Sequence, residues 1–279
     1  MKIVWQIAQT LLYKIMQMYM CAFNCFLKVY MLKLNKSKYM SGVLKMLYII
    51  LAWGLCAVIA FNIKRRPEVP IGTVTMKGIA SFLFILTGLI AMTENAALPK
   101  YMGALTIAGA CLGMIGDIVL DLKFVYPNDG DKYLKIGVIS FLFGHLFYSG
   151  SLITAYGLNK INILFGIGGF VLCFIGVLIA EKILPVDMAK FRWITAVYIG
   201  VVGITLGLSV SYSIAEHAVQ TRMFVVAMIA FLVSDFLLSG TYFGLTEKDR
   251  KNQVAITLNH TIYYIAQYLI MLSLAFYKG

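Results

Sequence analysis

The chain has 279 residues, of which 61% are hydrophobic and 13% are charged, and its formal net charge is +12. Soluble domains are about 45–50% apolar and about 25% charged, so this chain has too few polar side chains to cover a water-soluble globule. The composition excludes a soluble enzyme, a disordered chain and a coiled coil. The apolar runs are continuous and do not alternate with polar residues, which favours membrane-spanning helices over a transmembrane β-barrel.

Charged residues divide the chain into eight apolar runs. We predict an all-α fold, a polytopic transmembrane bundle of eight helices formed by residues 46–279, with connections too short for a soluble domain. Lys77 and Gly78 open the second run in this interpretation. The runs cover about 46–63, 78–93, 101–122, 136–159, 161–180, 193–215, 223–246 and 252–277.

Residues 1–45 differ from the rest because they carry seven lysines and no acidic residue. No small-residue cleavage site follows their apolar stretch, which argues against a signal peptide. We expect a basic N-terminal extension that is interfacial or dispensable, or sequence upstream of a start at Met40 or Met46.

The basic residues of the predicted membrane domain gather in alternate connections. The odd connections carry 13 Lys and Arg residues, and the even connections together with the C-terminus carry four. Because basic residues stay on the cytoplasmic side, we expect an integral protein of the cell membrane with its odd connections cytoplasmic. The seven lysines of the extension would then lie on the opposite side, which conflicts with this topology. The basic residues form no single patch, so we expect no nucleic-acid partner.

The five cysteines give no sign of a disulfide framework. Cys56, Cys111 and Cys173 lie inside apolar runs, where cysteine acts as a small apolar residue. Cys21 and Cys25 lack the further ligands of a zinc site. We expect no metal and no cofactor.

Two aspartates lie inside the apolar runs, Asp117 in the third and Asp235 near the middle of the seventh. A charge at mid-membrane costs at least about 2.5–3.5 kcal/mol, so a carboxyl group there is a functional candidate. Asp121 lies one helical turn beyond Asp117, on the same face, and either belongs to the site or marks the membrane surface. His145 and His260 also lie inside runs.

A short pattern occurs in both halves of the chain. Asp117-Ile-Val-Leu120 precedes His145-Leu-Phe-Tyr148, and Asp235-Phe-Leu-Leu238 precedes His260-Thr-Ile-Tyr263. The His and Tyr of each pair are three residues apart and so share a helical face. This pattern suggests a duplication of four helices plus four, related by a two-fold axis along the membrane normal.

The two aspartates and two histidines can share one layer of the membrane. They lie roughly 9–18 Å along their helices from the nearest odd connection, at 1.5 Å per residue. Two carboxyl groups in a low dielectric repel and tend to share one proton, which provides one acid and one base. We therefore predict a single site in which Asp117 and Asp235 are catalytic.

An ordered set of motifs over about residues 46–279 resembles the lysoplasmalogenase (YhhN-like) family of eight-span membrane proteins. Besides the repeated pattern, the matches are Lys77-Gly78, Gly116-Asp117, Phe141-Leu-Phe-Gly144-His145, Ser234-Asp235 and Tyr263-Tyr264-Ile-Ala266-Gln267. The family often has Pro where this chain has Gly78.

The resemblance implies hydrolysis of the vinyl ether bond of a lysoplasmalogen, a lysophospholipid taken from the membrane lipid. The products would be a fatty aldehyde and glycerophosphoethanolamine or glycerophosphocholine, with Asp117 and Asp235 as acid and base. The sequence does not indicate which aspartate is the acid, or the oligomeric state. The residues expected to bind the substrate are Lys77, Asp121, His145, Tyr148, His260, Tyr263, Tyr264 and Gln267.

Three other functions fit parts of the pattern. A small-molecule or proton-coupled transporter could carry a proton on the Asp pair, although the spans lack the Pro interruptions typical of such sites. A metal-dependent lipid hydrolase could use two Asp and two His as ligands. An intramembrane aspartyl protease has a Gly-x-Gly-Asp motif, but Gly113-Met-Ile-Gly116-Asp117 is one residue longer and no Pro-Ala-Leu is present.

Overall fold

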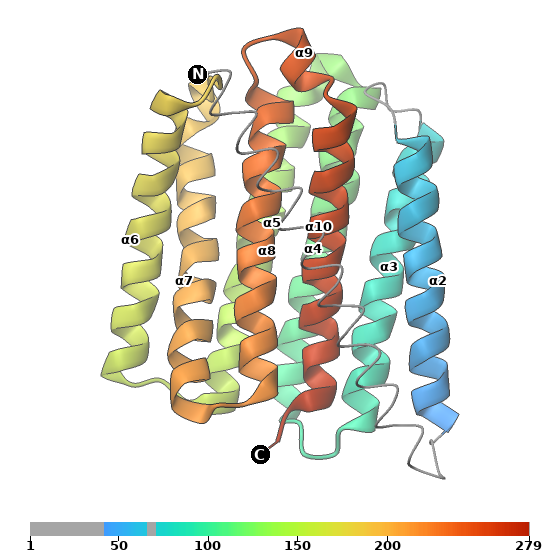
Figure 1. Ribbon diagram of the computed structural model, residues 1–279, viewed down its shortest axis with the longest axis vertical. Coiled ribbons are helices and arrows are strands. Elements are labelled where there is room, and N and C mark those ends of the chain that lie inside the picture. Colours follow the sequence, from blue (N-terminus) through green and yellow to red (C-terminus); the bar gives the residue numbers. More distant parts are fainter. Residues whose placement is uncertain (1–41, 66–70, 279) are drawn as a thin grey trace. The chain divides into compact units, whose positions relative to one another are not determined.

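The computed structural model describes residues 42–65 and 71–278, and long helices dominate this part of the chain (Figure 1). The long helices are α2 (Gly42–Lys64), α3 (Ile71–Glu94), α4 (Lys100–Val125), α5 (Gly130–Tyr156), α6 (Lys160–Ile183), α7 (Arg192–Glu216), α8 (Val219–Phe243) and α10 (Gln253–Ser273). The short helical segments are α9 (Glu247–Arg250), η1 (Pro127–Asp129), η2 (Ala189–Phe191) and η3 (Leu274–Phe276).

The chain divides into two compact units, Met1–Tyr48 and Ile49–Gly279. The first unit contributes only the beginning of α2 to the described residues. The predicted N-terminal extension, 1–45, therefore lies outside the described residues apart from the helical backbone of 42–45.

The helix ends follow from local sequence signals. Asn159 begins α6 with a capping box, in which its side chain accepts a hydrogen bond from the backbone of Asn162 and the side chain of Asn162 accepts one in return. Asn252 begins α10 by accepting from the backbone of the first helical turn. Gly157 ends α5 with a φ of 73°, a conformation that glycine adopts at low cost.

Seven of the described helices are long and apolar enough to cross a membrane, namely the described part of α2 with α3 to α8. The predicted polytopic bundle of membrane helices is confirmed, and the protein is a multi-pass membrane protein. The eighth helix, α10, is not among the seven because Asn259, His260 and Gln267 lower its hydropathy. Most of its residues are nevertheless buried by the other helices.

The helices of the second unit pack in two corresponding sets. Helix α4 packs on α3 and α5, and α8 packs on α7 and α10. The two sets meet where α5 packs on α7 and where α10 packs on α3. Each of these contacts thus has a counterpart under an exchange of the two halves, as a four-plus-four duplication predicts. The packing of α6 on α7 has no such counterpart among the helix contacts of the described residues.

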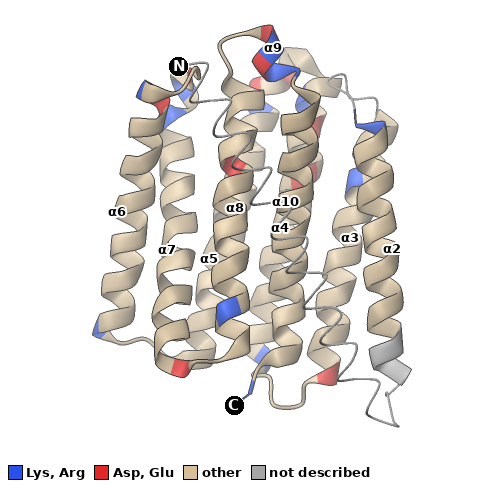
Figure 2. Ribbon diagram, viewed as in Figure 1, with Lys and Arg blue, Asp and Glu red and all other residues tan. Residues whose placement is uncertain are grey.

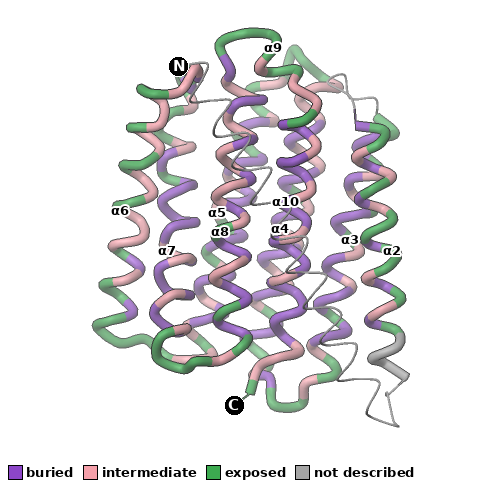
Figure 3. The backbone as a smooth tube through the Cα atoms, viewed as in Figure 1, coloured by how far each residue is buried: buried purple, intermediate pink, exposed green. Residues whose placement is uncertain are grey.

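Burial differs strongly among the helices. About 67% of the most apolar stretch of the α7 span is buried inside the protein, against 6% of that of α6 (Figure 3). Charged residues gather at the two ends of the bundle, and a few lie within the helices (Figure 2). The connections that follow α4, α6 and α8 lie at the end marked by α9, which we call the α9 end (Figure 1).

The placement of Lys77 differs from the prediction. We expected Lys77 to open the second span, but α3 begins at Ile71, so Lys77 lies within the helix and is 4% exposed. The prediction failed because a buried lysine paired with carboxylates is indistinguishable in sequence from one at a membrane surface. Asp121, one of whose two expected places was the membrane surface, is also buried, at 1% exposed.

Candidate active site

Asp117 of α4 and Asp235 of α8 line the same small cavity, which we call the aspartate cavity. Its volume is about 40 Å³. Because one water molecule needs at least about 10–15 Å³, the cavity has room for very few. The polar residues of its lining are Lys77, Asp117, Tyr198, Ser234, Asp235, Asn259, His260 and Tyr263.

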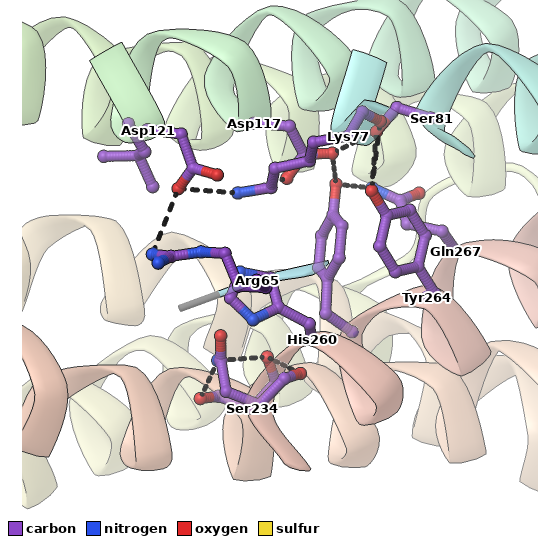
Figure 4. A network of polar contacts seen from close by, with 12 residues as sticks. Arg65, Lys77, Ser81, Asp117, Asp121, Ser234, His260, Tyr264 and Gln267 are labelled. Carbon is purple, nitrogen blue, oxygen red and sulfur yellow. Dashed lines mark hydrogen bonds and ion pairs between the residues drawn. The ribbon is translucent and has the colours of Figure 1, made fainter. Parts of the chain in front are cut away.

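Three donors converge on the carboxylate of Asp117 (Figure 4). Ser81 and Tyr263 donate hydrogen bonds of 2.6 and 2.7 Å to its Oδ2. The ammonium nitrogen of Lys77 lies 3.6 Å from its Oδ1. Asp117 is only 2% exposed, so these donors replace the water that a carboxylate would otherwise bind. The three donors favour the ionised form of Asp117 and oppose the cost of burying its charge.

Asp121 lies in the same network, on the side toward Arg65 (Figure 4). Its Oδ1 lies 3.4 Å from Lys77 Nζ and 3.7 Å from Arg65 Nη2. The four side chains of Arg65, Lys77, Asp117 and Asp121 are at most 5% exposed. Two cations thus balance two carboxylates, which is how buried charges are tolerated inside a membrane protein.

Helix α10 holds the carboxylate of Asp117 in place. Tyr263 and Gln267 are four residues apart and share a face, and Gln267 Nε2 donates to Tyr263 OH at 3.1 Å. Tyr148 of α5 donates in turn to Gln267 Oε1 at 2.8 Å. A chain of hydrogen bonds therefore runs from Tyr148 to Asp117. Gly113 makes room for it, because a Cβ at that position would lie 2.8 Å from Gln267 Nε2.

Tyr264 connects the same helix to α3. Its hydroxyl lies 3.2 Å from Ser81 Oγ and donates to the backbone carbonyl of Lys77 at 3.2 Å. Both partners contact Asp117, so Tyr264 acts on the site through the residues that hold the carboxylate.

Asp235 has fewer polar partners than Asp117. Tyr198 of α7 donates a hydrogen bond of 2.8 Å to its Oδ2. The described part of the chain forms no ion pair with Asp235. Next to it, Asn259 donates to the carbonyl and hydroxyl of Ser234 at 2.7 and 3.0 Å, which fastens α8 to α10. A carboxyl group with a single hydroxyl donor and no cation favours its neutral form.

Asp235 also lines a second, larger cavity of about 190 Å³, which we call the apolar cavity. Most of its walls are aliphatic or aromatic side chains from α4 to α8. The two cavities have five lining residues in common, which are Leu120, Val138, Tyr198, Asp235 and Leu238. Asp235 therefore stands between a polar cavity and an apolar one.

The two histidines have different surroundings. His260 lines the aspartate cavity, and its Nδ1 lies 2.7 Å from the carbonyl of Ile256. Because a carbonyl only accepts, Nδ1 carries the proton and Nε2 is left as an acceptor. His145 lines neither of the two cavities, and neither ring nitrogen has a hydrogen-bond partner. Its ring packs edge-on against Tyr148 and Phe231.

The structure thus brings Lys77, Asp117, Asp235, His260 and Tyr263 to one cavity. Four more of the predicted residues lie outside the lining and contact it through hydrogen bonds or ion pairs, directly or through one another. They are Asp121, Tyr148, Tyr264 and Gln267. Of the candidate site residues predicted from the sequence, His145 is the one that neither lines the aspartate cavity nor forms a side-chain hydrogen bond or ion pair with the described residues.

Two hydroxyl donors to the aspartates, Ser81 and Tyr198, were not among the residues predicted from the sequence. Ser81 precedes Asp117 by 36 residues, and Tyr198 precedes Asp235 by 37. Each donor comes from the helix before the one that carries the aspartate. The near-equal spacing is a further sign of duplication, and it could have identified either donor from the other.

Among the described residues, no group of three or more His, Cys, Asp and Glu side chains could hold a metal ion. The histidines and aspartates therefore do not form the ligand set that the metal-dependent alternative requires.

Comparison with known families confirms the resemblance seen in the motifs. The model of the YhhN family matches residues 72–274. Neither the search of curated proteins nor the search of solved structures gave a match. The matched region covers most of the chain and contains both aspartates, Lys77 and the polar residues of α10, and the protein belongs to the YhhN family.

Proposed function

We propose that this protein is a membrane lipid hydrolase that cleaves the vinyl ether bond of lysoplasmalogens. The YhhN family includes lysoplasmalogenases. The observation that carries the proposal is the placement of Asp117 and Asp235 in the lining of one water-sized cavity that adjoins an apolar one. This combination suits the addition of water to an atom at the end of a hydrocarbon chain.

The unequal surroundings of the two aspartates support different roles for them. Ser81, Tyr263 and Lys77 stabilise Asp117 as a carboxylate, so it serves as the base and stabilises a cation. Asp235 has one hydroxyl donor, from Tyr198, and an apolar cavity on one side, so it holds the proton and serves as the acid.

The first step is transfer of the Asp235 proton to the β-carbon of the vinyl ether. The π electrons of the double bond form the new C–H bond, and an oxocarbenium ion results. The negative charge of Asp117 stabilises this ion, and Asp235 is left as a carboxylate.

In the second step a water molecule adds to the oxocarbenium carbon and gives a proton to Asp117. The product is a hemiacetal. Its hydroxyl proton passes to Asp235, Asp117 returns its proton to the leaving oxygen, and the C–O bond breaks. A fatty aldehyde and glycerophosphoethanolamine or glycerophosphocholine are released, and both aspartates regain their starting states. Nε2 of His260, an acceptor in the cavity lining, orients the water.

The transporter alternative receives less support. Transporter sites of this kind are typically built from discontinuous helices, whose exposed backbone ends bind the cargo. The two helices that carry the aspartates, α4 and α8, run without interruption from Lys100 to Val125 and from Val219 to Phe243. The continuous backbone favours the hydrolase.

We further propose that the protein resides in the cell membrane with its α9 end in the cytoplasm. The basic residues of the odd connections support this orientation, even with the buried Lys77 removed from their number. Single cysteines at Asn128 and Leu158, which are exposed at opposite ends, test it. An impermeant thiol reagent added to intact cells should label Leu158→Cys and spare Asn128→Cys, and the reverse pattern would contradict the orientation.

The proposed reaction is tested with the purified protein in detergent. Three lysophosphatidylethanolamines that differ only at the first glycerol carbon are offered: a vinyl ether, a saturated ether and an ester. The vinyl ether should yield free aldehyde, and the other two should yield no product. If folded protein releases no aldehyde, or cleaves the ester instead, the proposal is wrong.

A further inference from the structure

The apolar cavity is closed toward the α9 end by a contact between two connections. Asp187 donates from its backbone to the carbonyl of Phe243 at 2.9 Å, and Leu245 donates to the carbonyl of Pro185 at 3.0 Å. Val186, which pairs with Gly244 in this contact, is 6% exposed and lines the cavity. A ligand therefore does not reach the cavity from the water at this end.

The side of the cavity at α6 is different. In its first half, α6 packs closely on α7, since a Cβ on Gly169 would lie 2.0 Å from the carbonyl oxygen of Gly203. In its second half, Gly176, Val177 and Ala180 line the apolar cavity. Gly176 is exposed, and a Cβ there would meet no atom within 4 Å. The cavity thus opens beside Gly176.

This opening faces the membrane, because α6 is the least buried of the spanning helices. Around it, Leu172, Ile175 and Ile179 are exposed apolar side chains. Molecules that approach from this direction come out of the hydrocarbon layer of the bilayer. The entrance therefore selects apolar groups without any need for a charged recognition site.

The size of the cavity limits what can enter. An apolar cavity of about 150 Å³ holds one benzene molecule, so the volume of about 190 Å³ here holds a short length of one hydrocarbon chain. A second chain has no place in it. At the inner limit stand Asp235 and Tyr198, which the aspartate cavity shares.

We propose that the apolar cavity binds the hydrocarbon chain of a single-chain membrane amphiphile, which enters from the bilayer past Gly176 and places the head-proximal end of the chain at Asp235. This chain site adds a substrate-binding site to the proposed function, and it rests on that function for the chemistry at Asp235. Because the apolar cavity has room for one chain, the site would favour a lysolipid over a two-chain lipid.

The experiment uses a probe that cannot react at a vinyl ether. It is a saturated 1-O-alkyl lysophosphatidylethanolamine with a photoreactive diazirine among the first carbons of its chain, added to the full-length protein in detergent. After illumination, mass spectrometry locates the cross-links. We expect them at 176–184 and 232–243, and an excess of the unlabelled saturated ether should suppress them. Cross-links spread over the outer helix faces and insensitive to competition would overturn the inference.

Two glycines of α6 provide a matched pair of variants. A Cβ at either Gly176 or Gly168 meets no atom within 4 Å, but only Gly176 lines the cavity. Gly176→Leu should weaken probe binding about tenfold, the loss expected when about two methylene groups are displaced. Gly168→Leu should bind as the wild type does. Equal affinity in both variants would overturn the inference, and Val177→Phe repeats the test if Gly176→Leu does not fold.

The same samples distinguish this inference from the proposed function. If the cavity residues are cross-linked but the vinyl ether yields no aldehyde, the chain site stands and the proposed reaction is wrong. If aldehyde is released but the cross-links lie elsewhere, the reaction stands and the chain site is wrong.

Discussion

Asp117 and Asp235 line one cavity but differ in the number of donors that contact their carboxyl groups. Three donors contact Asp117, and a single hydroxyl contacts Asp235. The inequality follows from the neighbouring helices. Helices α3 and α10 present Ser81, Lys77 and Tyr263 to α4, whereas α7 presents only Tyr198 to α8. Two carboxyl groups that a duplication would make alike are thereby given different chemistry.

Lys77 should be essential for stability. Among the described residues, Lys77→Met leaves Asp121 with Arg65 as its remaining ion-pair partner and leaves Asp117 with none. Breaking a buried ion pair on one side typically costs about 3–5 kcal/mol, so thermal unfolding in detergent should occur at a clearly lower temperature.

The control for this prediction is Lys132→Met, which removes an exposed ion pair with Asp129 and should leave the unfolding temperature unchanged. Adding Asp121→Asn to Lys77→Met should restore part of the lost stability. If Lys77→Met unfolds at the same temperature as the wild type, the buried network does not hold these helices together.

The hydrogen-bond chain on α10 predicts a graded effect on turnover. Tyr263→Phe removes a direct donor to Asp117, and should slow aldehyde release about tenfold, as expected for a hydrogen bond to a charged group. Tyr148→Phe removes a donor two links further away and should have a smaller effect. Steady-state rates of the two variants check the order, and a larger loss in Tyr148→Phe would contradict it.

Substitution of the two histidines should affect aldehyde release differently, although both lie in the same sequence motif. His260→Ala removes an acceptor from the lining of the aspartate cavity and should slow aldehyde release at saturating substrate. His145→Phe keeps the ring contacts of a side chain that has no hydrogen bond, and should retain activity and stability. An inactive His145→Phe variant together with an active His260→Ala variant would contradict these roles of the two histidines.

A chelator should leave the rate of aldehyde release unchanged, because the proposed chemistry needs only carboxyl groups and water. Incubation with excess EDTA before the assay checks this expectation. Loss of activity that zinc or another divalent ion restores would instead favour the metal-dependent hydrolase.

Much of the fold follows from the sequence because most of the helices are long apolar runs, and some of them, such as α6, begin at a capping residue. The aspartates of α4 and α8 stand out for the same reason, since a carboxyl group inside such a run is costly. Lys77 was misplaced because a charge was taken to end a run. Its true position depends on two carboxylates about forty residues away, which no local pattern reports.

The partners of the aspartates were harder to predict than the aspartates themselves. Ser81 and Tyr198 belong to residue types that are common in membrane helices, and only the packing of α3 on α4 and of α7 on α8 makes them donors. His145 is the opposite case, because the sequence singles it out and it lies outside the lining of both cavities. It shares its motif with His260, yet it packs behind Phe231 and Tyr198 and lines neither cavity.

Whether an aspartate pair protonates the vinyl ether carbon is measured by mass analysis of the aldehyde formed in D2O. The aldehyde is reduced as it forms, and the wild type is compared with Asp117→Asn and Asp235→Asn. We expect one deuterium on carbon 2 of the wild-type product, and rates about 10²- to 10⁴-fold lower in both folded variants. An aldehyde without deuterium at carbon 2, or near wild-type rates in both variants, would contradict it.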